Sequence, residues 1–307
     1  MPFILSLGEL YRLEKKFSFV TVEVYGKTHE GRELLALHIN KSNRNTVFLT
    51  SLIHAREWIS GCVTMKIINQ LLNSSEGEKL INLYRFIIIP VSNPDGYEYS
   101  HTNNRYWRKN REPTANKHCF GVDINRNFAY GFKVVDNVSE ISCSELYQGS
   151  EPLSSKEAQM LNFILIKYHK DIRYFVDYHS YGNVWMYAYG THQWTPRNSK
   201  QLIKFSDEAV KVLKNYTQQM WKSGSAFHVL YACHGILVDH VHYYVTPLAF
   251  TAEVGNEESG FLIPDNHITH YTSSQWEVLR SQLQLLQKHI HSGEYTREKH
   301  TNWRKLG

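Results

Sequence analysis

The chain has 307 residues, of which 42% are hydrophobic and 21% charged, and its formal net charge is +5 at pH 7. These values are ordinary for a globular protein with one large domain or two smaller ones. The positive charge is spread along the chain without a basic cluster, so nucleic acid is not a predicted partner. The longest apolar runs, such as residues 86–91, are too short to span a bilayer, so no membrane partner is predicted.

The first part of the chain is predicted to alternate between helices and strands. Strands 20–24 and 34–39, joined by a turn at 28–32, form a predicted hairpin. Residues 84–91 are continuously apolar, which is typical of a strand that is buried on both faces. The predicted helices are 5–17 and 59–72, and the predicted strands are 20–24, 34–39, 47–50 and 84–91.

Residues 92–149 show no regular periodicity. Turn formers such as Asn93-Pro-Asp-Gly96 are frequent there, but so are aromatic residues, which argue against disorder. A long irregular stretch in a compact domain is usually functional, so this segment is predicted to form an ordered active-site rim. Cys119 and Cys143 flank a loop within this segment and could form a disulfide. Of the other two cysteines, Cys62 is predicted to be a small buried residue in a helix, and Cys233 has no obvious partner.

The second half again alternates between helices and strands. Ser154-Ser-Lys-Glu157 matches a capping box that opens a helix to about residue 170. Residues 226–244 are predicted to be irregular. Residues 1–292 are predicted to form one domain, which a polar, basic tail follows at 293–307. The predicted strands are 172–178, 184–189 and 248–254, and the other predicted helices are 202–216 and 275–290. This alternation predicts an α/β domain.

Ser51–Trp58 contains the first candidate ligands for a metal. His54 and Glu57 are three residues apart just after the predicted strand 47–50, and His179 follows strand 172–178 in the same way. Ligands in open α/β sheets bind at this carboxyl edge. Two histidines and one glutamate suit a hydrolytic zinc site with an open position. The alternative is a solvated helix face and a hydrogen-bonded histidine beside the sheet.

Six motifs occur in order along nearly the whole chain, and together they resemble a zinc metallocarboxypeptidase of the pancreatic carboxypeptidase A/B type. They are His54-Ala-Arg-Glu-Trp58, Asn93-Pro-Asp-Gly96, Asn104-Arg-Tyr-Trp-Arg-Lys109, Gly121-Val-Asp-Ile-Asn-Arg-Asn127, Asp177-Tyr-His-Ser-Tyr181 and Ala252-Glu-Val254. The resemblance implies a single α/β domain with a mixed, mostly parallel eight-stranded sheet flanked by helices. It also implies a zinc-dependent exopeptidase with one Zn²⁺ per chain, held by His54, Glu57 and His179.

The resemblance assigns roles to further residues. Glu253 would be the general base, and Arg108 would stabilise the oxyanion. Arg126 and Asn125 would grip the C-terminal carboxylate of the substrate, and the mobile Tyr231 would close over it. Arg56 and Arg105 would lie further along the cleft, Asp123 would orient His54, and Cys119 would be bonded to Cys143.

A preference for C-terminal aliphatic or aromatic residues is predicted from the residues at the positions that, by this resemblance, form the substrate pocket. Val238 stands where an aspartate would pair with a basic side chain, and Ala226 stands where a larger aliphatic residue is typical, which indicates a roomier pocket. The other matching positions are neutral: Met186, Gly190, Leu230, Cys233 and Thr251. Two alternatives remain open, namely a basic or other C-terminal preference and an inactive binding homologue.

Relatives of this type are usually made with a signal peptide and a pro-segment of about a hundred residues. Neither is visible in this sequence, and residues 1–7 have no basic start. An extracellular location is therefore expected from the family and from the Cys119–Cys143 pair. The expected partners are peptide or protein C-termini and proteinaceous carboxypeptidase inhibitors, and the expected oligomeric state is a monomer.

Overall fold

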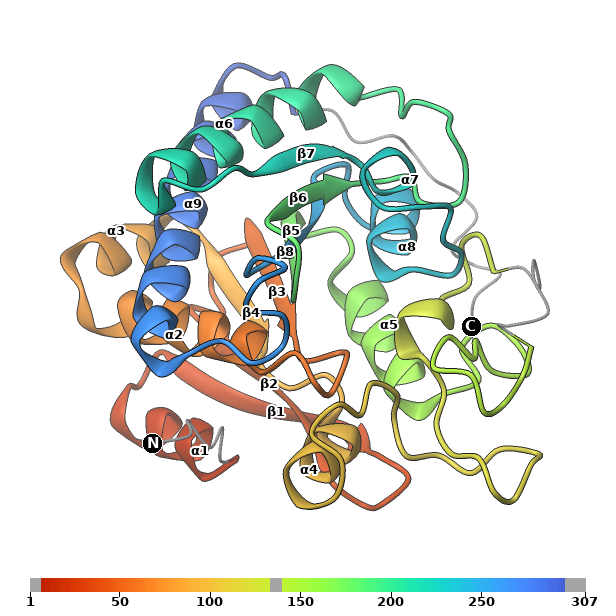
Figure 1. Ribbon diagram of the computed structural model, residues 1–307. Coiled ribbons are helices and arrows are strands. Elements are labelled where there is room, and N and C mark those ends of the chain that lie inside the picture. Colours follow the sequence, from red (N-terminus) through yellow and green to blue (C-terminus); the bar gives the residue numbers. More distant parts are fainter. Residues whose placement is uncertain (1–6, 133–139, 296–307) are drawn as a thin grey trace.

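The computed structural model describes residues 7–132 and 140–295 and contains one mixed sheet of eight strands (Figure 1). The strand order is β1-β2-β4-β3-β5-β8-β6-β7. The strands are β1 (Val20–Lys27), β2 (Glu33–Ile39), β3 (Thr46–Ser51), β4 (Arg85–Ile89), β5 (Ile172–His179), β6 (Val184–Tyr187), β7 (Lys222–Ser225) and β8 (Ala249–Glu253). The predicted α/β class and the eight-stranded sheet are confirmed.

The middle of the sheet is parallel. Strand β3 pairs in parallel with β4 and β5, and β5 pairs in parallel with β8. Antiparallel pairs lie on both sides of this centre, including the predicted β1–β2 hairpin. The carboxyl ends of β3, β5 and β8 therefore meet at one edge of the sheet, which is where open α/β sheets bind ligands.

Helices cover both faces of the sheet. Helices α2, α6 and α9 lie together on one side, and α5, α7 and α8 lie on the other (Figure 1). The helices are α1 (Leu7–Lys16), α2 (Trp58–Asn73), α3 (Ser75–Leu83), α4 (Pro94–Thr102), α5 (Lys156–Tyr168), α6 (Ser199–Thr217), α7 (Ala226–Val229), α8 (Leu237–Tyr244), α9 (Asp265–His291) and the short 3-10 helix η1 (Ile124–Arg126).

Each face of the sheet has its own apolar core because successive side chains of a strand point to opposite faces. In β3, Leu49 belongs to the core under α2 and α9, whereas the adjacent Phe48 belongs to the core under α5 and α8. Both side chains are completely buried. This double burial explains the continuous apolar runs of the central strands.

Several predicted elements differ from the observed ones. Asn93-Pro-Asp-Gly96 opens helix α4 rather than a simple turn: the Asn93 side chain accepts a hydrogen bond from the backbone of Gly96, and Pro94 occupies the first turn. The cap of α5 is Ser155, which accepts from the backbone of Ala158, rather than Ser154. The segment 226–244, predicted to be irregular, contains α7 and α8.

The two ends of the chain extend past the described part. Residues 5–6 of the first predicted helix and residues 296–307 of the predicted tail lie outside the described residues. Tyr295, at the end of the described part, donates a backbone hydrogen bond to the carbonyl of His289. None of the helices in the described ranges has both the length and the hydropathy that crossing a bilayer requires.

Candidate metal centre and active site

His54, Glu57 and His179 lie together at the carboxyl edge of the sheet. His54 follows β3, Glu57 is the cap residue of α2, and His179 is the last residue of β5. The backbone amide of Glu57 donates to the carbonyl oxygen of His54, which closes a tight turn between strand and helix. This turn brings the two side chains of the His-x-x-Glu pair to the same side.

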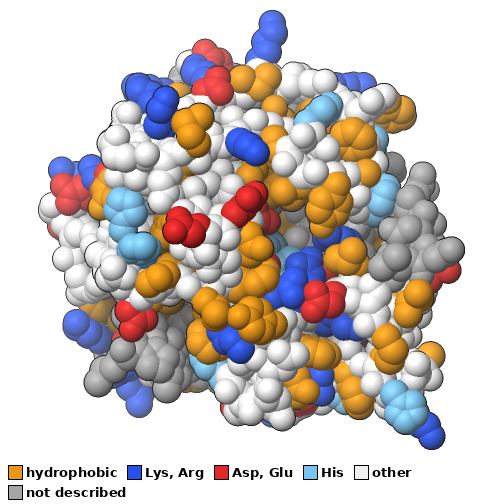
Figure 2. Space-filling view, in the orientation of Figure 1, with side chains coloured by type: hydrophobic (Ala, Val, Ile, Leu, Met, Phe, Trp, Pro, Cys, Tyr) orange, Lys and Arg blue, Asp and Glu red, His pale blue; other side chains and the backbone are white. Residues whose placement is uncertain are grey.

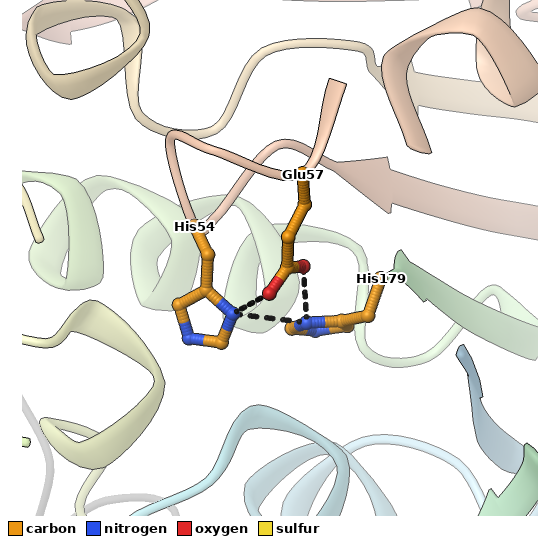
Figure 3. Close-up of side chains that lie close together, drawn as sticks. All are labelled: His54, Glu57 and His179. Atoms are coloured by element: carbon orange, nitrogen blue, oxygen red, sulfur yellow. Dashed lines mark hydrogen bonds and ion pairs between the residues drawn. The ribbon is translucent and has the colours of Figure 1, made fainter. Parts of the chain in front are cut away.

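The three side chains point toward one another (Figure 3). One carboxylate oxygen of Glu57 lies 2.7 Å from Nδ1 of His54, and the other lies 3.0 Å from Nδ1 of His179. The two Nδ1 atoms are 3.2 Å apart, and all three residues are at least 95% buried. Two imidazole nitrogens and a carboxylate are the donors that zinc prefers in hydrolytic sites, so this group can hold a metal ion.

The second nitrogen of each imidazole contacts a buried carboxylate. Nε2 of His54 lies 3.2 Å from Asp123, and Nε2 of His179 lies 2.6 Å from Asp177. Such carboxylates fix the ring orientation and the tautomer of histidines that bind a metal. Asp123 was predicted in this position from the resemblance, but Asp177 was not assigned a role. Its position two residues before His179 on the same strand was the signal, because alternate side chains of a strand share a face.

The two neighbouring histidines stabilise the ionised form of the Glu57 carboxylate. Burial alone would raise the pKa of Glu57, but the adjacent imidazoles of His54 and His179 hold it well below its usual value. The amide of Ser180 also donates to Glu57 at 3.2 Å. The carboxylate is therefore anionic at neutral pH, as a metal ligand must be.

Arg108 lies beside this group and is held by a second carboxylate. Its Nε donates to Asp123 at 3.0 Å, and Nη2 lies 2.9 Å from the same carboxyl group. Its Nη1 is 4.0 Å from Glu57. Asp123 thus connects His54 and Arg108, and it fixes a cation next to the candidate metal ligands.

A second cation, Arg126, lies at the end of η1. Its Nη1 donates to the carbonyl of Asn125 at 2.7 Å, and Nη2 donates to the hydroxyl of Tyr231 at 2.9 Å. Arg126 is 91% buried, yet it pairs with no carboxylate among the described residues. The side-chain oxygen of Asn125 accepts from the amide of Leu237, and its amide nitrogen has no partner within the described chain. This arrangement leaves donors for an anionic group.

Glu253 is the last residue of β8 and lies directly opposite His179 in the parallel register. Its carboxylate forms no hydrogen bond or ion pair with the described residues, and it lines the cavity described below. Burial, followed by the nearby carboxylates of Glu57 and Asp177, raises the pKa of Glu253 to about 8, against the lowering effect of His179 and Arg108.

Most of these groups line one cavity of about 210 Å³, which opens into the hollow near the middle of the face in Figure 2, whereas His179, Asp123 and Asp177 are not part of its lining. Its polar lining includes His54, Glu57, Arg108, Asn125, Arg126, Ser180, Tyr231, Thr251 and Glu253. Its apolar lining includes Met186, Ala226, Leu230, Cys233, Ile236, Val238 and Phe261, with Tyr181 beside them. Ile236 was not among the predicted pocket residues. The resemblance led us to expect a small residue at its position, which would not project into a pocket.

Three residues predicted for the substrate cleft do not line this cavity. Gly190 lies behind Cys233 and Ile236, whose side chains cover it. Arg56 pairs with Glu145 at 3.0 Å, and Arg105 stacks 3.6 Å above the ring of Trp58. Both guanidinium groups therefore already interact with other side chains, one with a carboxylate and one with an aromatic ring.

The rim contains the predicted Cys119–Cys143 disulfide, which the structure confirms. Cys62 and Cys233 are free. A second cavity of about 470 Å³ adjoins the disulfide and includes Arg108, Lys109 and Arg111 in its lining. It contains none of the three candidate metal ligands, so the chemistry belongs to the smaller cavity.

Comparison with known proteins decides the family. The profile of the zinc carboxypeptidase family, Peptidase M14, matches residues 9–278. The chain belongs to the zinc carboxypeptidase family. By this membership the protein is a metallocarboxypeptidase, a peptide hydrolase. The resemblance seen in the sequence is therefore confirmed.

Individual relatives agree with this membership. The chain is 32% identical over 259 residues to carboxypeptidase B of Astacus astacus, and the match covers 81% of this chain and 84% of that protein. It is also 32% identical to metallocarboxypeptidase A of Trichophyton rubrum, of which it covers 60%. It is 34% identical over 297 residues to the inactive metallocarboxypeptidase ECM14 of Saccharomyces cerevisiae, with 87% of this chain and 66% of that protein covered.

Solved structures of zinc carboxypeptidases have the same fold. Carboxypeptidase A from Helicoverpa armigera matches with a TM-score of 0.85 at 30% identity, over 90% of this chain and 71% of that one. Bovine thrombin-activatable fibrinolysis inhibitor, in complex with tick carboxypeptidase inhibitor, matches with a TM-score of 0.86 at 29% identity, over 92% of this chain and 97% of that one.

Proposed function

We propose that this zinc carboxypeptidase removes single residues from the C-termini of peptides and proteins, with a preference for aliphatic or aromatic C-terminal side chains. The observation that carries the proposal is Arg126. It is a buried guanidinium without a carboxylate partner among the described residues, and it lines the same cavity as His54 and Glu57, two of the three candidate metal ligands.

His54, Glu57 and His179 would hold one zinc ion per chain. The donor set fits zinc, and each imidazole is oriented by a carboxylate, as histidine ligands require. Zinc bound there supplies a Lewis acid that polarises a carbonyl group and makes water a better nucleophile at neutral pH.

Glu253 is the proposed general base. Its carboxyl group faces the cavity without a partner among the described residues, so its ionised form can accept a proton from the attacking water and pass it to the leaving amine. Arg108, fixed by Asp123, is positioned to stabilise negative charge that develops on the carbonyl oxygen.

Arg126 and Asn125 are the proposed clamp for the terminal carboxylate. The planar guanidinium can donate two hydrogen bonds to a carboxylate, and the side chain of Asn125 offers a further donor. The hydroxyl of Tyr231 now accepts from Nη2 of Arg126, so a bound carboxylate would take its place. An internal peptide bond offers no such carboxylate, which makes the proposed reaction one at the chain end.

The apolar lining supports the proposed C-terminal preference. Val238 is 97% buried and lines the cavity, and Met186 and Thr251 are neutral. Asp239, the residue after Val238, has its carboxylate engaged by the backbone amides of Gly190 and Thr191. A basic C-terminal side chain would therefore meet no free carboxylate in this part of the cavity.

Two alternatives are favoured by single observations. Similarity to a protein named carboxypeptidase B favours a basic C-terminal preference. Similarity to a protein named inactive metallocarboxypeptidase favours an inactive binding homologue, although Glu253, Arg108 and all three candidate ligands are present in this chain.

One experiment separates these functions. The purified chain is analysed for zinc and then assayed, with and without a chelator, on blocked dipeptides ending in Phe, Leu, Arg and Glu. We expect about one zinc per chain and chelator-sensitive release of Phe or Leu faster than Arg or Glu. Faster release of Arg would favour the basic preference, and zinc binding without release would favour the inactive homologue.

The remaining proposals concern the setting of the enzyme. The Cys119–Cys143 disulfide supports an extracellular location, since such bonds persist in oxidising compartments. The neighbour solved with a tick inhibitor supports proteinaceous inhibitors as partners. We further propose that the protein is monomeric, with residues 1–292 as the catalytic domain and 293–307 as a tail.

A further inference from the structure

We infer that Ile236 and Cys233 close the side-chain pocket toward Gly190, and that this wall makes the enzyme select branched aliphatic C-terminal residues such as leucine over aromatic ones such as phenylalanine. The inference rests on the proposed function and narrows its substrate class. Neither the comparisons nor the predicted pocket positions assign this role to Ile236.

Ile236 and Cys233 form the surface of the cavity where Gly190 would otherwise do so. Both side chains are about 95% buried, and both line the cavity, whereas Gly190 does not. A β-carbon placed on Gly190 would lie 2.5 Å from Sγ of Cys233 and 2.7 Å from Cδ1 of Ile236. The two side chains therefore fill the space next to this glycine, and removing either would extend the cavity to the backbone.

Hydrogen bonds hold this wall in place. The amide of Cys233 donates to the carbonyl of Gly190 at 3.0 Å, and the amide of Leu237 donates to the side chain of Asn125 at 2.8 Å. Between them, Gly235 has a φ of +62°, and any β-carbon there would lie 2.2 Å from the carbonyl oxygen of Arg126. The segment is thus packed against the backbone of the proposed carboxylate clamp, and the two hydrogen bonds oppose its movement away from it.

The position of the wall relative to the clamp sets the length of side chain that fits. A terminal carboxylate held by Arg126 fixes the Cα atom of the last residue, so its side chain must end before Ile236 and Cys233. An aromatic ring reaches farther from Cα than the methyl groups of leucine. A tightly packed wall disfavours a larger side chain, because the surrounding side chains would have to leave their preferred rotamers to make room, and this costs free energy.

The test compares kcat/KM for blocked dipeptides ending in Leu and in Phe, using the zinc-loaded full chain and the variants Ile236→Ala, Ile236→Val and Cys233→Ala. We expect the wild type to favour Leu. We expect Ile236→Ala to lower the Leu/Phe ratio at least about tenfold, the range for a methylene-sized change in an apolar pocket. Ile236→Val should give an intermediate ratio, and Cys233→Ala should act in the same direction as Ile236→Ala.

Ile203→Ala is the matched control, since Ile203 is 46% exposed on α6 and lies outside the cavity. It should leave the ratio unchanged. A wild type that releases Phe faster than Leu would overturn the inference, as would ratios within twofold of wild type in both alanine variants. If the zinc-loaded wild type releases no C-terminal residue at all, the proposed function itself fails, and the inference fails with it.

Discussion

Arg126 donates a 2.9 Å hydrogen bond to the hydroxyl oxygen of Tyr231, a residue 105 positions later in the sequence. Arg126 is 91% buried, whereas Tyr231 is 53% exposed at the mouth of the cavity. The Tyr231 hydroxyl accepts a hydrogen bond from Nη2 of Arg126, the donor that the proposed substrate carboxylate would use. A substrate carboxylate that takes this donor would displace the Tyr231 hydroxyl, which would link recognition of the chain end to movement of the Tyr231 side chain.

Replacing Arg126 should weaken recognition of the C-terminal carboxylate. For Arg126→Ala we expect kcat/KM on a blocked dipeptide to fall by about 10- to 150-fold or more, because hydrogen bonds to charged groups contribute about 1.5–3 kcal/mol each. Arg126→Lys should recover part of this loss, since it keeps the charge without the planar fork. Arg12→Ala, at a 73% exposed side chain, is the control. Equal losses on a substrate with an amidated C-terminus would contradict the assignment.

Replacing the proposed base should slow the chemical step without removing the metal. Glu253→Gln keeps the shape of the side chain but cannot accept a proton, so we expect kcat to fall about 100- to 10,000-fold. Zinc content should remain that of the wild type, because Glu253 is not among the three converging ligands. Glu258→Gln, a nearby exposed position, should keep full activity. Retention of kcat in Glu253→Gln would exclude the proposed role.

The carboxylate behind His179 should contribute to metal affinity. Asp177 contacts Nε2 of His179 at 2.6 Å and accepts a hydrogen bond of 2.7 Å from Thr50. For Asp177→Asn we expect zinc affinity to fall about 10- to 100-fold, measured by competition with a chelator of known affinity. Thr50→Val should give a smaller loss in the same direction. The exposed Asp207→Asn is the control, and unchanged affinity in Asp177→Asn would contradict the positioning role.

A buried acid far from the metal ligands should make stability depend on pH. Burial, followed by the neighbouring Glu112, raises the pKa of Glu157 to about 8, against about 4.3 in an unfolded chain. Between these two values the folded protein holds a proton that the unfolded chain has lost. The contribution of Glu157 to stability should therefore fall as the pH rises through this window, by at most about 1.4 kcal/mol per pH unit.

Glu157→Gln tests this dependence, because glutamine does not ionise. We expect the melting temperature of the variant to exceed that of the wild type increasingly from about pH 4 to about pH 8, and by a constant amount above that, with little difference at pH 4. Thermal unfolding followed by circular dichroism across this range measures the effect. The exposed Glu78→Gln on α3 should follow the wild-type curve. Parallel curves for Glu157→Gln and wild type would refute the assigned pKa.

Local signals in the sequence predicted the central strands and the positions of the candidate metal ligands, whereas the eight-stranded sheet and the ligand set were implied by the resemblance. Apolar runs marked the central strands, and His54 and His179 each followed one of them. The pairing of β3 with β5 then brought together residues 125 positions apart. Only the resemblance selected Glu253 and Arg126, since an isolated glutamate or arginine has no distinguishing local pattern.

The sequence did not predict features that depend on tertiary contacts. Asn93-Pro-Asp-Gly96 suits a turn as well as a helix start, and the contacts of α4 decided between them. The segment containing α7 and α8 is short and mixed in composition, so periodicity gave no signal. The position of Ile236 could not be predicted, because it depends on packing against Gly190, a residue distant in sequence.

The pocket wall has a consequence for how selectivity can diverge. Ala226, Leu230, Tyr231, Cys233, Ile236 and Val238 all lie within one contiguous stretch, 226–238, whereas the three metal-ligating candidates and Glu253 lie outside it. The stretch is joined to the scaffold by the bonds from Phe227 to Tyr189 and from Leu237 to Asn125. Substitutions confined to this stretch would reshape much of the pocket while the candidate metal ligands and Glu253 stay in place, so gene duplicates that differ only there would share one reaction and differ in the residue they remove.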